Sequence, residues 1–406
     1  MKILLINQTF FPDLAATAQY LTDFALHLVT SGHDVTVLTG RRSYLFPGRL
    51  YRERETFHGI KVIRVWSFPF NRRLKILRIL DAFLLNLSFA WHLLGLSNFD
   101  QFVAMTTPPL VGWIASLFAK WRHSQFIYWV MDINPDQAVQ AGWIRQDGFQ
   151  ARLTGRMLSD ILKRSDKTIV LDRFMKKNVL SKGALPESVE IIPPWAPEEI
   201  IDSISHEKSS FRTQHQLDEK FVVMYSGNLS ICHPLNTVLE AALTLKSDRS
   251  IQFLFIGGGA RLPEILEFKE KNELSNVTYL NYQERDQLKD SLSAADLHVV
   301  AMGNSYTGIV HPSKIYGILA VGRPFIFIGP VESPIGELVQ ETGVGRQIEH
   351  GDIAGFIRTI HETRQLSLEE KREIARKSID LKNTRFSQEK LTQKLMELFC
   401  HGALSR

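Results

Sequence analysis

Residues 1–40 read MKILLINQTF FPDLAATAQY LTDFALHLVT SGHDVTVLTG, and this stretch decides the fold class. It contains two short and nearly continuous apolar runs, Lys2–Asn7 and Asp34–Thr39, which are typical of buried strands. Between them, Ala18–Thr30 repeats apolar residues at helical spacing, and Gly32 ends the pattern. Strand, helix and strand in this order predict one βαβ unit of a parallel sheet.

The same alternation continues outward along the chain. We expect further strands at Lys61–Trp66, Gln101–Met105, Phe126–Val130, Lys167–Leu171, Phe221–Tyr225, Gln252–Ile256, Val277–Leu280, Leu297–Ala301 and Pro324–Ile328. Helical patterns fill most of the gaps, for example at Leu235–Leu245 and Glu284–Ala294. Because the strands are apolar throughout and rich in β-branched residues, we predict an α/β protein whose parallel sheets are covered by helices on both faces.

A proline-rich stretch at residues 191–197, IIPPWAP, interrupts the alternation and predicts a linker. The chain has 406 residues, which suggests two domains because one core rarely grows beyond about 250–300 residues. We predict two doubly wound, Rossmann-like domains, residues 1–195 and 196–385, facing each other across a cleft. Residues 386–406 include the helical pattern Gln388–Phe399, which either caps the second domain or crosses back to the first.

Composition and charge exclude several classes of protein. The two cysteines, Cys232 and Cys400, cannot form a disulfide scaffold or a cysteine-based zinc site. The net charge of +5 fits either a solvated basic surface or affinity for phosphate-bearing ligands or an anionic membrane face, and no pattern indicates nucleic acid. The longest apolar tract, Ala82–Leu96, is too short and too interrupted to span a membrane, and the first residues do not resemble a signal peptide. We therefore expect a cytoplasmic protein.

Common nucleotide and hydrolase motifs are missing. The sequence has no Walker A motif, no Gly-x-Ser-x-Gly and no His-Glu-x-x-His. Gly257, Gly258 and Gly259 follow a predicted strand, but Leu262 stands where a dinucleotide fingerprint needs its third glycine. A Rossmann cofactor site is therefore not indicated.

Two stretches point to phosphate binding. Gly227, at the end of a predicted strand, allows close approach of a ligand, and a helix follows whose free N–H groups suit phosphate; the alternative is an ordinary strand–helix turn. In His311-Pro312-Ser313-Lys314, Pro312 suits a helix start and Ser313 can cap it. A cation in the first helical turn opposes the helix dipole, so Lys314 either faces an anionic ligand such as a diphosphate or is merely solvated.

Polar residues at other predicted strand ends are candidates for sugar contacts. Glu332 lies in a turn-rich loop, where its carboxylate either binds sugar hydroxyls or is solvated. Asp132 follows a buried strand and either contacts a substrate hydroxyl or shapes a turn. The loops around Thr107 and around Ala16 and Thr17 occupy the same edge of the predicted first sheet.

The tract Phe68–Leu96 mixes basic, aromatic and aliphatic residues. This composition suits a helix that lies in a bilayer interface, and the alternative is a buried helical hairpin. The candidate membrane contacts are Arg72, Arg73, Lys75, Arg78 and Trp91.

Taken together, these motifs resemble glycosyltransferase family four, which has the GT-B fold. The resemblance covers nearly the whole chain. It includes the opening FFPD with SGHDVTVLTG (31–40), FIGGG (255–259), AAD (294–296) and LAVGRP (319–324), all in the family's order. Within the family the chain is most similar to WbuB-type enzymes of bacterial polysaccharides such as O-antigen.

The resemblance implies a retaining transfer, without metal or cofactor, from a nucleotide-activated sugar that is usually UDP-linked. It implies a donor site on the second domain and an acceptor site on the first, often for polyprenyl-diphosphate-linked saccharides at the cytoplasmic membrane face. Our candidate catalytic residues, chosen from the motifs above, are Asp132 and Lys314. The candidate nucleotide-sugar-binding residues are Gly227, Asn228, His233, Gly258, Ser313, Lys314 and Glu332, and the candidate acceptor-binding residues are Ala16, Thr17, Thr107 and Asp132.

The sequence also departs from the family. The two paired glutamates are replaced by Ile309 and Gly317, and the usual Arg and Lys of the phosphate loop are replaced around Asn228 and His233. We therefore hypothesise that Lys314 supplies the charge for the phosphates and that Glu332 replaces the ribose-binding carboxylate. Two other functions remain open: a nucleotide-sugar 2-epimerase, and a catalytically silent GT-B scaffold that partners an active transferase.

Overall fold

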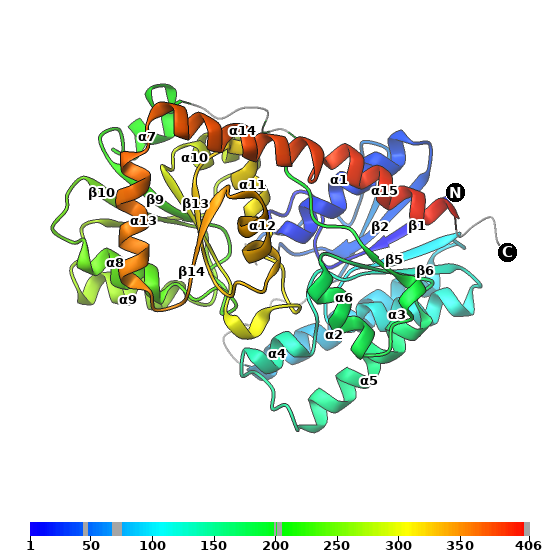
Figure 1. The fold of residues 1–406 in the computed structure, drawn as a ribbon. Coiled ribbons are helices and arrows are strands. Elements are labelled where there is room, and N and C mark those ends of the chain that lie inside the picture. Colours follow the sequence, from blue (N-terminus) through cyan, green and yellow to red (C-terminus); the bar gives the residue numbers. More distant parts are fainter. Residues whose placement is uncertain (44–47, 67–74, 199, 201–204, 402–406) are drawn as a thin grey trace. The chain divides into compact units, whose positions relative to one another are not determined.

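The computed structural model describes residues 1–43, 48–66, 75–198, 200 and 205–401, and it consists of two compact units (Figure 1). Unit 1 comprises Met1–Pro193, the short segment Gly308–His311 and Glu389–Arg406. Unit 2 comprises Pro194–Thr307 and Pro312–Gln388. Unit 1 is therefore assembled from three separate stretches of the chain.

Unit 1 is built on an eight-stranded sheet with the order β3-β4-β2-β1-β5-β6-β7-β8 in the described residues. All neighbouring strands are parallel except β3, which runs antiparallel to β4. The strands are β1 (Lys2–Ile6), β2 (Asp34–Gly40), β3 (Arg54–Phe57), β4 (Ile60–Val65), β5 (Gln101–Ala104), β6 (Gln125–Trp129), β7 (Lys167–Val170) and β8 (Val189–Ile191). β1 and β5 are buried almost throughout, as expected for strands covered on both faces.

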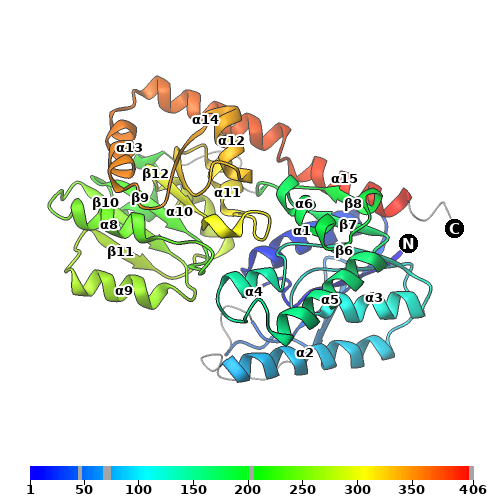
Figure 2. The ribbon, with the colours of Figure 1, turned by 60° about the horizontal axis from the view of Figure 1, so that its bottom comes forward.

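Helices cover both faces of this sheet. Figure 2 shows α2 (Lys75–Gly95), α3 (Val111–Trp121) and α5 (Phe149–Arg164) on one side, and α1 (Ala16–Thr30) and α15 (Gln388–His401) on the other. The shorter α4 (Asp136–Gln140) and α6 (Arg173–Ser181) follow β6 and β7. None of the helices in the described part of the chain combines the length and the apolar character needed to cross a bilayer.

Unit 2 is built on a six-stranded, fully parallel sheet with the order β11-β10-β9-β12-β13-β14 in the described residues. Its strands are β9 (Phe221–Ser226), β10 (Ile251–Ile256), β11 (Val277–Leu280), β12 (Leu297–Ala301), β13 (Phe325–Ile328) and β14 (Gly345–Ile348). Its helices are α7 (Ser210–Gln214), α8 (Asn236–Thr244), α9 (Leu262–Lys271), α10 (Leu288–Ser293), α11 (Lys314–Val321), α12 (Pro334–Thr342), α13 (Ile353–Gln365) and α14 (Leu368–Thr384).

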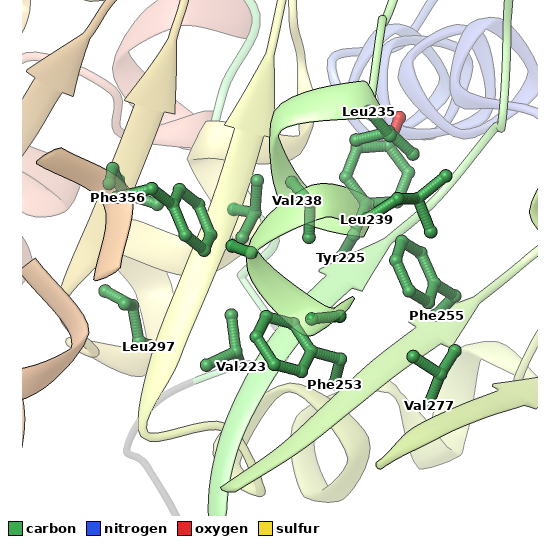
Figure 3. Close-up of a cluster of buried hydrophobic side chains, with 14 of the residues drawn as sticks. Val223, Tyr225, Leu235, Val238, Leu239, Phe253, Phe255, Val277, Leu297 and Phe356 are labelled. Atoms are coloured by element: carbon green, nitrogen blue, oxygen red, sulfur yellow. The ribbon is translucent and has the colours of Figure 1, made fainter. Parts of the chain in front are cut away.

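The core of unit 2 lies between this sheet and the helices α8 and α13. Figure 3 shows Val223 and Tyr225 of β9, and Phe253 and Phe255 of β10, beside the apolar face of α8. These side chains are almost completely buried. Their packing fixes the direction in which β9 and β10 deliver the loops at their carboxyl ends.

The structure contains elements that the sequence did not indicate. Three edge strands, β3, β8 and β14, were missed because edge strands are short and half-exposed and carry no continuous apolar run. The predicted linker begins inside β8, which ends at Ile191. In the tract Phe68–Leu96, the described residues 75–95 form the single helix α2 rather than a helical hairpin.

The last helix, α15, belongs to unit 1 apart from its first residue. Its side chains Leu395 and Phe399 are fully buried. The Phe399 ring meets the Phe24 ring of α1 edge to face at 5.1 Å, and the Gln101 side chain donates a hydrogen bond to the Phe399 carbonyl at 2.6 Å. The C-terminal helix is therefore part of the unit 1 core.

Replacement of Phe399 by alanine is expected to lower the free energy of unfolding by about 3–5 kcal/mol, because it leaves a cavity beside Phe24. Urea denaturation followed by tryptophan fluorescence measures this change. The matched control is Glu397→Ala on the exposed face of α15, which should change stability by less than about 0.5 kcal/mol. Equal stability of the two variants would contradict the role assigned to α15.

Candidate functional site

In unit 2, the loops that follow β9 and β10 lie in direct backbone contact. The Gly227 N–H donates to the Ile256 carbonyl at 2.9 Å, and the Leu229 N–H donates to the Gly258 carbonyl at 2.8 Å. A Cβ on Gly257 would lie 2.1 Å from the Gly227 carbonyl oxygen, and Gly257 has a φ of +132°. Only glycine fits there, so the two loops form one backbone surface at the carboxyl edge of the sheet.

Lys314 lies against this surface. It is the first residue of α11, and its Nζ sits 4.8 Å from the centre of the Tyr225 ring. Its Cε would be only 2.9 Å from a Cβ on Gly227, so the absence of a side chain at Gly227 makes room for the lysine. Burial lowers the pKa of Lys314 from its usual 10.5 to about 7. Burial therefore makes the protonated amine energetically unfavourable, and an anionic ligand bound beside it would stabilise the positive charge.

His233 lies near Lys314 but is not a second cation. Its Nδ1 is 2.7 Å from the Ala301 carbonyl oxygen and donates a hydrogen bond to it. Burial, together with the charge of Lys314, holds the pKa of His233 well below its usual 6.5. The ring is therefore neutral at physiological pH, with Nε2 left as an acceptor.

The other residues expected to bind the nucleotide-sugar lie on neighbouring loops of unit 2. Asn228 accepts a hydrogen bond from the Tyr225 hydroxyl through its backbone carbonyl at 2.8 Å, and the Gly258 carbonyl accepts one from Tyr282 at 3.0 Å. Ser313 occupies the N-cap position of α11, but its side chain does not cap the helix, contrary to the prediction. Its helical backbone conformation explains this, because a capping side chain needs an extended residue.

Glu332 stands apart from this cluster. It is exposed in the loop between β13 and α12, and its carboxylate makes no ion pair with any described residue. Its neighbour Ser333 caps α12 by accepting a hydrogen bond from the Gly336 N–H. The structure thus leaves Glu332 available to a ligand but does not bring it to Lys314.

In unit 1, the buried side chain of Asn7 connects the loops expected to bind the acceptor. It accepts a hydrogen bond from the Thr107 hydroxyl at 2.7 Å and donates to the Thr9 hydroxyl at 3.1 Å. Thr9 in turn lies 3.0 Å from the Thr17 hydroxyl. Ala16 begins α1 beside this network. Sequence reasoning missed Asn7 because it counted this residue only as the end of a strand.

Asp132 follows β6 and is half-buried. Burial raises the pKa of its carboxyl group to about 6, and the charge of His311 opposes this rise. No described residue donates a hydrogen bond to the carboxylate. An unpartnered carboxylate that is still accessible is suited to bind a ligand's hydroxyl or cationic group.

The segment Gly308–His311 joins unit 1 at this point, which the sequence did not indicate. The Ile133 N–H donates to the Ile309 carbonyl at 2.9 Å. Nδ1 of His311 lies 2.8 Å from Oδ2 of Asp172. Because the partners are far apart in the sequence, no local pattern could have revealed them.

The candidate membrane contacts are only partly described. Arg72 and Arg73 lie outside the described residues, as do the side chains of Lys75 and Arg78 on α2. Trp91 is described, and 75 % of its surface is exposed.

Residues 16–195 match the model of the glycosyl transferase 4-like domain, and residues 207–378 match that of the glycosyl transferases group 1. The chain belongs to glycosyltransferase family four. The family resemblance predicted from the sequence is thereby confirmed. The transferase is also 25 % identical to the probable glycosyltransferase WbjE of Pseudomonas aeruginosa, over 66 % of this chain and 67 % of that one.

A second relative extends over almost the whole chain. The putative colanic acid biosynthesis glycosyl transferase WcaI of Escherichia coli K12 is 23 % identical over 94 % of this chain and 97 % of its own. Among solved structures, Anabaena HepE in complex with UDP and glucose has a TM-score of 0.76 at 16 % identity, covering 99 % of this chain and all of HepE. WaaG, a glycosyltransferase involved in lipopolysaccharide biosynthesis, has a TM-score of 0.70 at 15 % identity. The match covers 98 % of this chain and 99 % of WaaG. The predicted α/β fold of the GT-B class is confirmed.

Replacement of Lys314 by methionine is expected to stabilise this glycosyltransferase. The folded state binds the Lys314 proton with a pKa of about 7 and the unfolded state near 10.5, so wild-type stability rises with pH between these values. The variant should gain about 1 kcal/mol at pH 6–7, a figure discounted for partial exposure, and the gain should shrink towards pH 10. Chemical denaturation across this range measures it.

Lys271→Met is the matched control, because this lysine is exposed on α9. A gain of the same size and pH dependence in the control would show that Lys314 carries no special cost. A loss of stability in Lys314→Met at neutral pH would contradict the assignment directly.

Proposed function

We propose that this family-four enzyme is a retaining, metal-independent glycosyltransferase. It transfers a sugar, most simply a hexose, from a UDP-linked donor to a polyprenyl-diphosphate-linked saccharide in bacterial surface polysaccharide or O-antigen synthesis. The observation that carries the proposal is the position of Lys314, packed on Tyr225 and in the space left by Gly227. The names of WbjE and WcaI and the UDP bound to HepE support the reaction class and the donor.

The donor's diphosphate fits the charge arrangement of unit 2. Lys314 has lost part of its affinity for a proton through burial, and a diphosphate beside it would restore that affinity. The N-terminus of α8 (Asn236–Thr244) adds N–H donors to the same loop. His233, being neutral, offers Nε2 as an acceptor for a sugar hydroxyl instead of a charge for phosphate.

The positions of the missing family glutamates, Gly317 and Ile309, are both described. A Cβ on Gly317 would lie 3.1 Å from Cδ1 of Leu292, so a side chain there requires a small shift of the Leu292 side chain. Ile309 is buried, and its carbonyl bonds Ile133. Ribose and sugar recognition therefore fall to other groups, and we propose the exposed carboxylate of Glu332 and the amide of Asn228.

The transfer itself needs little covalent participation by the protein. The bond between the anomeric carbon and the diphosphate oxygen breaks, and its electron pair leaves with the diphosphate beside Lys314. The acceptor hydroxyl forms the new bond from the same face, and its proton passes to the departing diphosphate oxygen. Asp132 and the Thr107 and Thr17 loops of unit 1 orient the acceptor.

Donor affinity is expected to fall as pH rises above about 7, because the donor prefers the protonated Lys314. The decrease should approach tenfold per pH unit for UDP-glucose, whose diphosphate does not titrate in this range. Lys314→Ala should weaken binding at pH 7 at least about tenfold and remove the pH dependence, whereas Lys271→Ala should change neither. Calorimetry from pH 6.5 to 9 measures both quantities.

The same preparation tests the reaction. It is incubated with UDP-, GDP- and dTDP-sugars and a polyprenyl-diphosphate disaccharide, with and without EDTA, and NMR compares the anomeric configuration of product and donor. Donor binding without turnover on any acceptor would favour the silent scaffold, and epimerised UDP-sugar without glycoside would favour the epimerase. Unchanged donor affinity in Lys314→Ala would overturn the role of Lys314.

We also propose that unit 1 binds the inner face of the cytoplasmic membrane, where a lipid-linked acceptor resides. The helix α2 buries Leu85, Phe89 and Leu93 against the unit, yet it is also apolar on its outer face. That outer face exposes a stripe at spacings of three and four residues, formed by Leu80, Phe83, Leu87, Trp91 and Leu94. Covering an apolar stripe of this kind removes it from water and lowers the free energy, so an exposed stripe indicates a binding surface.

The excess of basic residues on α2, α3 and α5 favours an anionic lipid surface as the binding partner of this stripe. The helix α3 packs against α2, and α5 packs against α3 (Figure 2). These two helices also expose aromatic side chains, Trp121 on α3 and Phe149 on α5. By sequence, α2, α3 and α5 together carry seven Lys or Arg and two Asp, and one of these, Asp81, is buried. Aromatic and basic residues combined are typical of interfacial helices on anionic membranes.

The triple variant Phe83→Gln, Leu87→Gln, Trp91→Gln is expected to bind anionic vesicles at least about tenfold more weakly than wild type, because three exposed apolar side chains no longer enter the interface. Sedimentation with phosphatidylcholine vesicles, with and without phosphatidylglycerol, measures the binding. The control is Leu368→Gln, an equally exposed leucine of unit 2. Equal binding by the triple variant, or self-association through this face, would contradict the proposal.

A further inference from the structure

Unit 2 contains a pocket that the proposed reaction does not use. It has a volume of about 560 Å³, within the range of about 300–1,000 Å³ that is common for small-molecule sites. Its walls come from the start of α8, from residues 303–306 after β12, and from the connection between β14 and α13. All of its lining residues belong to unit 2. The described residues that line it do not include Lys314 or any other candidate nucleotide-sugar residue, although the pocket and the donor loop both adjoin α8.

Hydrogen bonds fix the two other walls of the pocket to the α8 segment. The Gly303 N–H, after β12, donates to the carbonyl of Cys232, which shortly precedes α8, at 2.9 Å. The Gly351 N–H, in the connection between β14 and α13, donates to the Thr237 hydroxyl of α8 at 3.0 Å. The walls are thus held by the protein itself, and the pocket is formed before any ligand enters.

Part of the lining is apolar. The rings of Tyr306 and Pro234 both approach Gly303, where a Cβ would lie 3.0 Å from Cδ2 of Tyr306 and 3.4 Å from Cγ of Pro234. Ile353, the first residue of α13, adds an aliphatic side chain. Tyr306 is buried, and Pro234 and Ile353 are half-buried. These carbon surfaces can cover the C–H face of a ligand ring and remove it from water.

Several polar side chains of the lining carry groups that no described residue satisfies. The Glu240 carboxylate, the Asn304 amide and the Ser305 hydroxyl form no hydrogen bond or ion pair within the described part of the chain. His350 lies with its Nε2 2.9 Å from the Met302 carbonyl oxygen. Because a carbonyl oxygen only accepts, Nε2 carries the proton and the neutral ring presents Nδ1 as an acceptor. The pocket therefore offers both donors and acceptors to a ligand.

The charge of the lining selects against anions and metal ions. Among the described residues that line the pocket there is no lysine or arginine, and the Glu240 carboxylate would repel a phosphate. Arg261 donates to the Asn236 side chain at 2.7 Å, but it is also paired with Glu264 at 2.9 Å. No cluster of three His, Cys, Asp or Glu side chains that could hold a metal ion occurs in the described residues. The pocket thus suits a ligand without negative charge that has hydroxyl groups and an apolar face.

We propose that this pocket binds one pyranose ring of a saccharide, independently of the nucleotide-sugar. The C–H face of the ring packs against Pro234 and Ile353, and its hydroxyl groups donate to the Glu240 carboxylate and to Nδ1 of His350. The amide of Asn304 donates to a ring or hydroxyl oxygen. The inference goes beyond the proposed function and does not rest on it, because sugar binding here requires neither a donor nor an acceptor.

Saturation-transfer NMR of the full-length protein with glucose, galactose, mannose and N-acetylglucosamine tests this site. At least one sugar should receive saturation on its ring protons. The double variant Glu240→Ala, Asn304→Ala should bind that sugar at least about tenfold more weakly, because a hydrogen bond to a charged group is lost. Ser305→Trp places an indole in the pocket from an exposed position and should abolish binding. The control Glu267→Ala, exposed on α9, should bind as wild type does.

Lys314→Ala distinguishes this pocket from the surface assigned to the donor and should leave sugar binding unchanged. Loss of sugar binding in Lys314→Ala would overturn the inference, as would full binding by a folded Ser305→Trp. The absence of a signal from every sugar, or displacement of the sugar by inorganic phosphate, would overturn it as well. Circular dichroism and thermal unfolding establish that each variant is folded, and the double variant decides the question if Ser305→Trp is not.

Discussion

The contact between the loops after β9 and β10 is the constraint on which unit 2's site depends. A Cβ on Gly257 would meet the Gly227 carbonyl oxygen, and Gly227 has a φ of +131° that disfavours any other residue, so the backbone itself forms the floor of the site. The space left at Gly227 is then filled by the stem of Lys314, which enters from the start of α11. The buried packing of β9 and β10 beneath holds this arrangement in place. The depressed pKa of the lysine is thus a consequence of backbone packing.

The two units each contain a group whose charge depends on pH, and the two groups are charged at opposite ends of the pH range. Lys314 carries its charge below about pH 7, whereas Asp132 is ionised above about pH 6. Both states required by the proposed reaction coexist in the free protein over a narrow interval near neutrality. Donor binding would widen this interval on the alkaline side, because a diphosphate stabilises the lysine cation. In each unit the largest cause of the shift is the same, namely the desolvation of an ionisable group by burial.

The strand–helix alternation predicted the fold class because each buried parallel strand is a continuous apolar run. Such a run can be recognised in the local sequence without knowing which strands pair with it. Gly227 and Lys314 were recognisable for a similar reason, since a glycine at a strand end and a cation in a first helical turn are both locally unusual. The edge strand β8 and the failure of Ser313 to cap α11 were not recognisable, because each depends on packing or backbone angles. The same holds for Asn7 and for the pair of His311 with Asp172, whose contacts join distant parts of the chain.

The composition of unit 1 from three stretches has a consequence for synthesis on the ribosome. Its first 193 residues emerge first, yet the pocket beside Phe24 stays open until α15 has been made. Unit 2 ends at Gln388 and so has all its residues before unit 1 does. The part of the chain translated first is therefore the part completed last, and during elongation its exposed apolar surface is a natural target for chaperones.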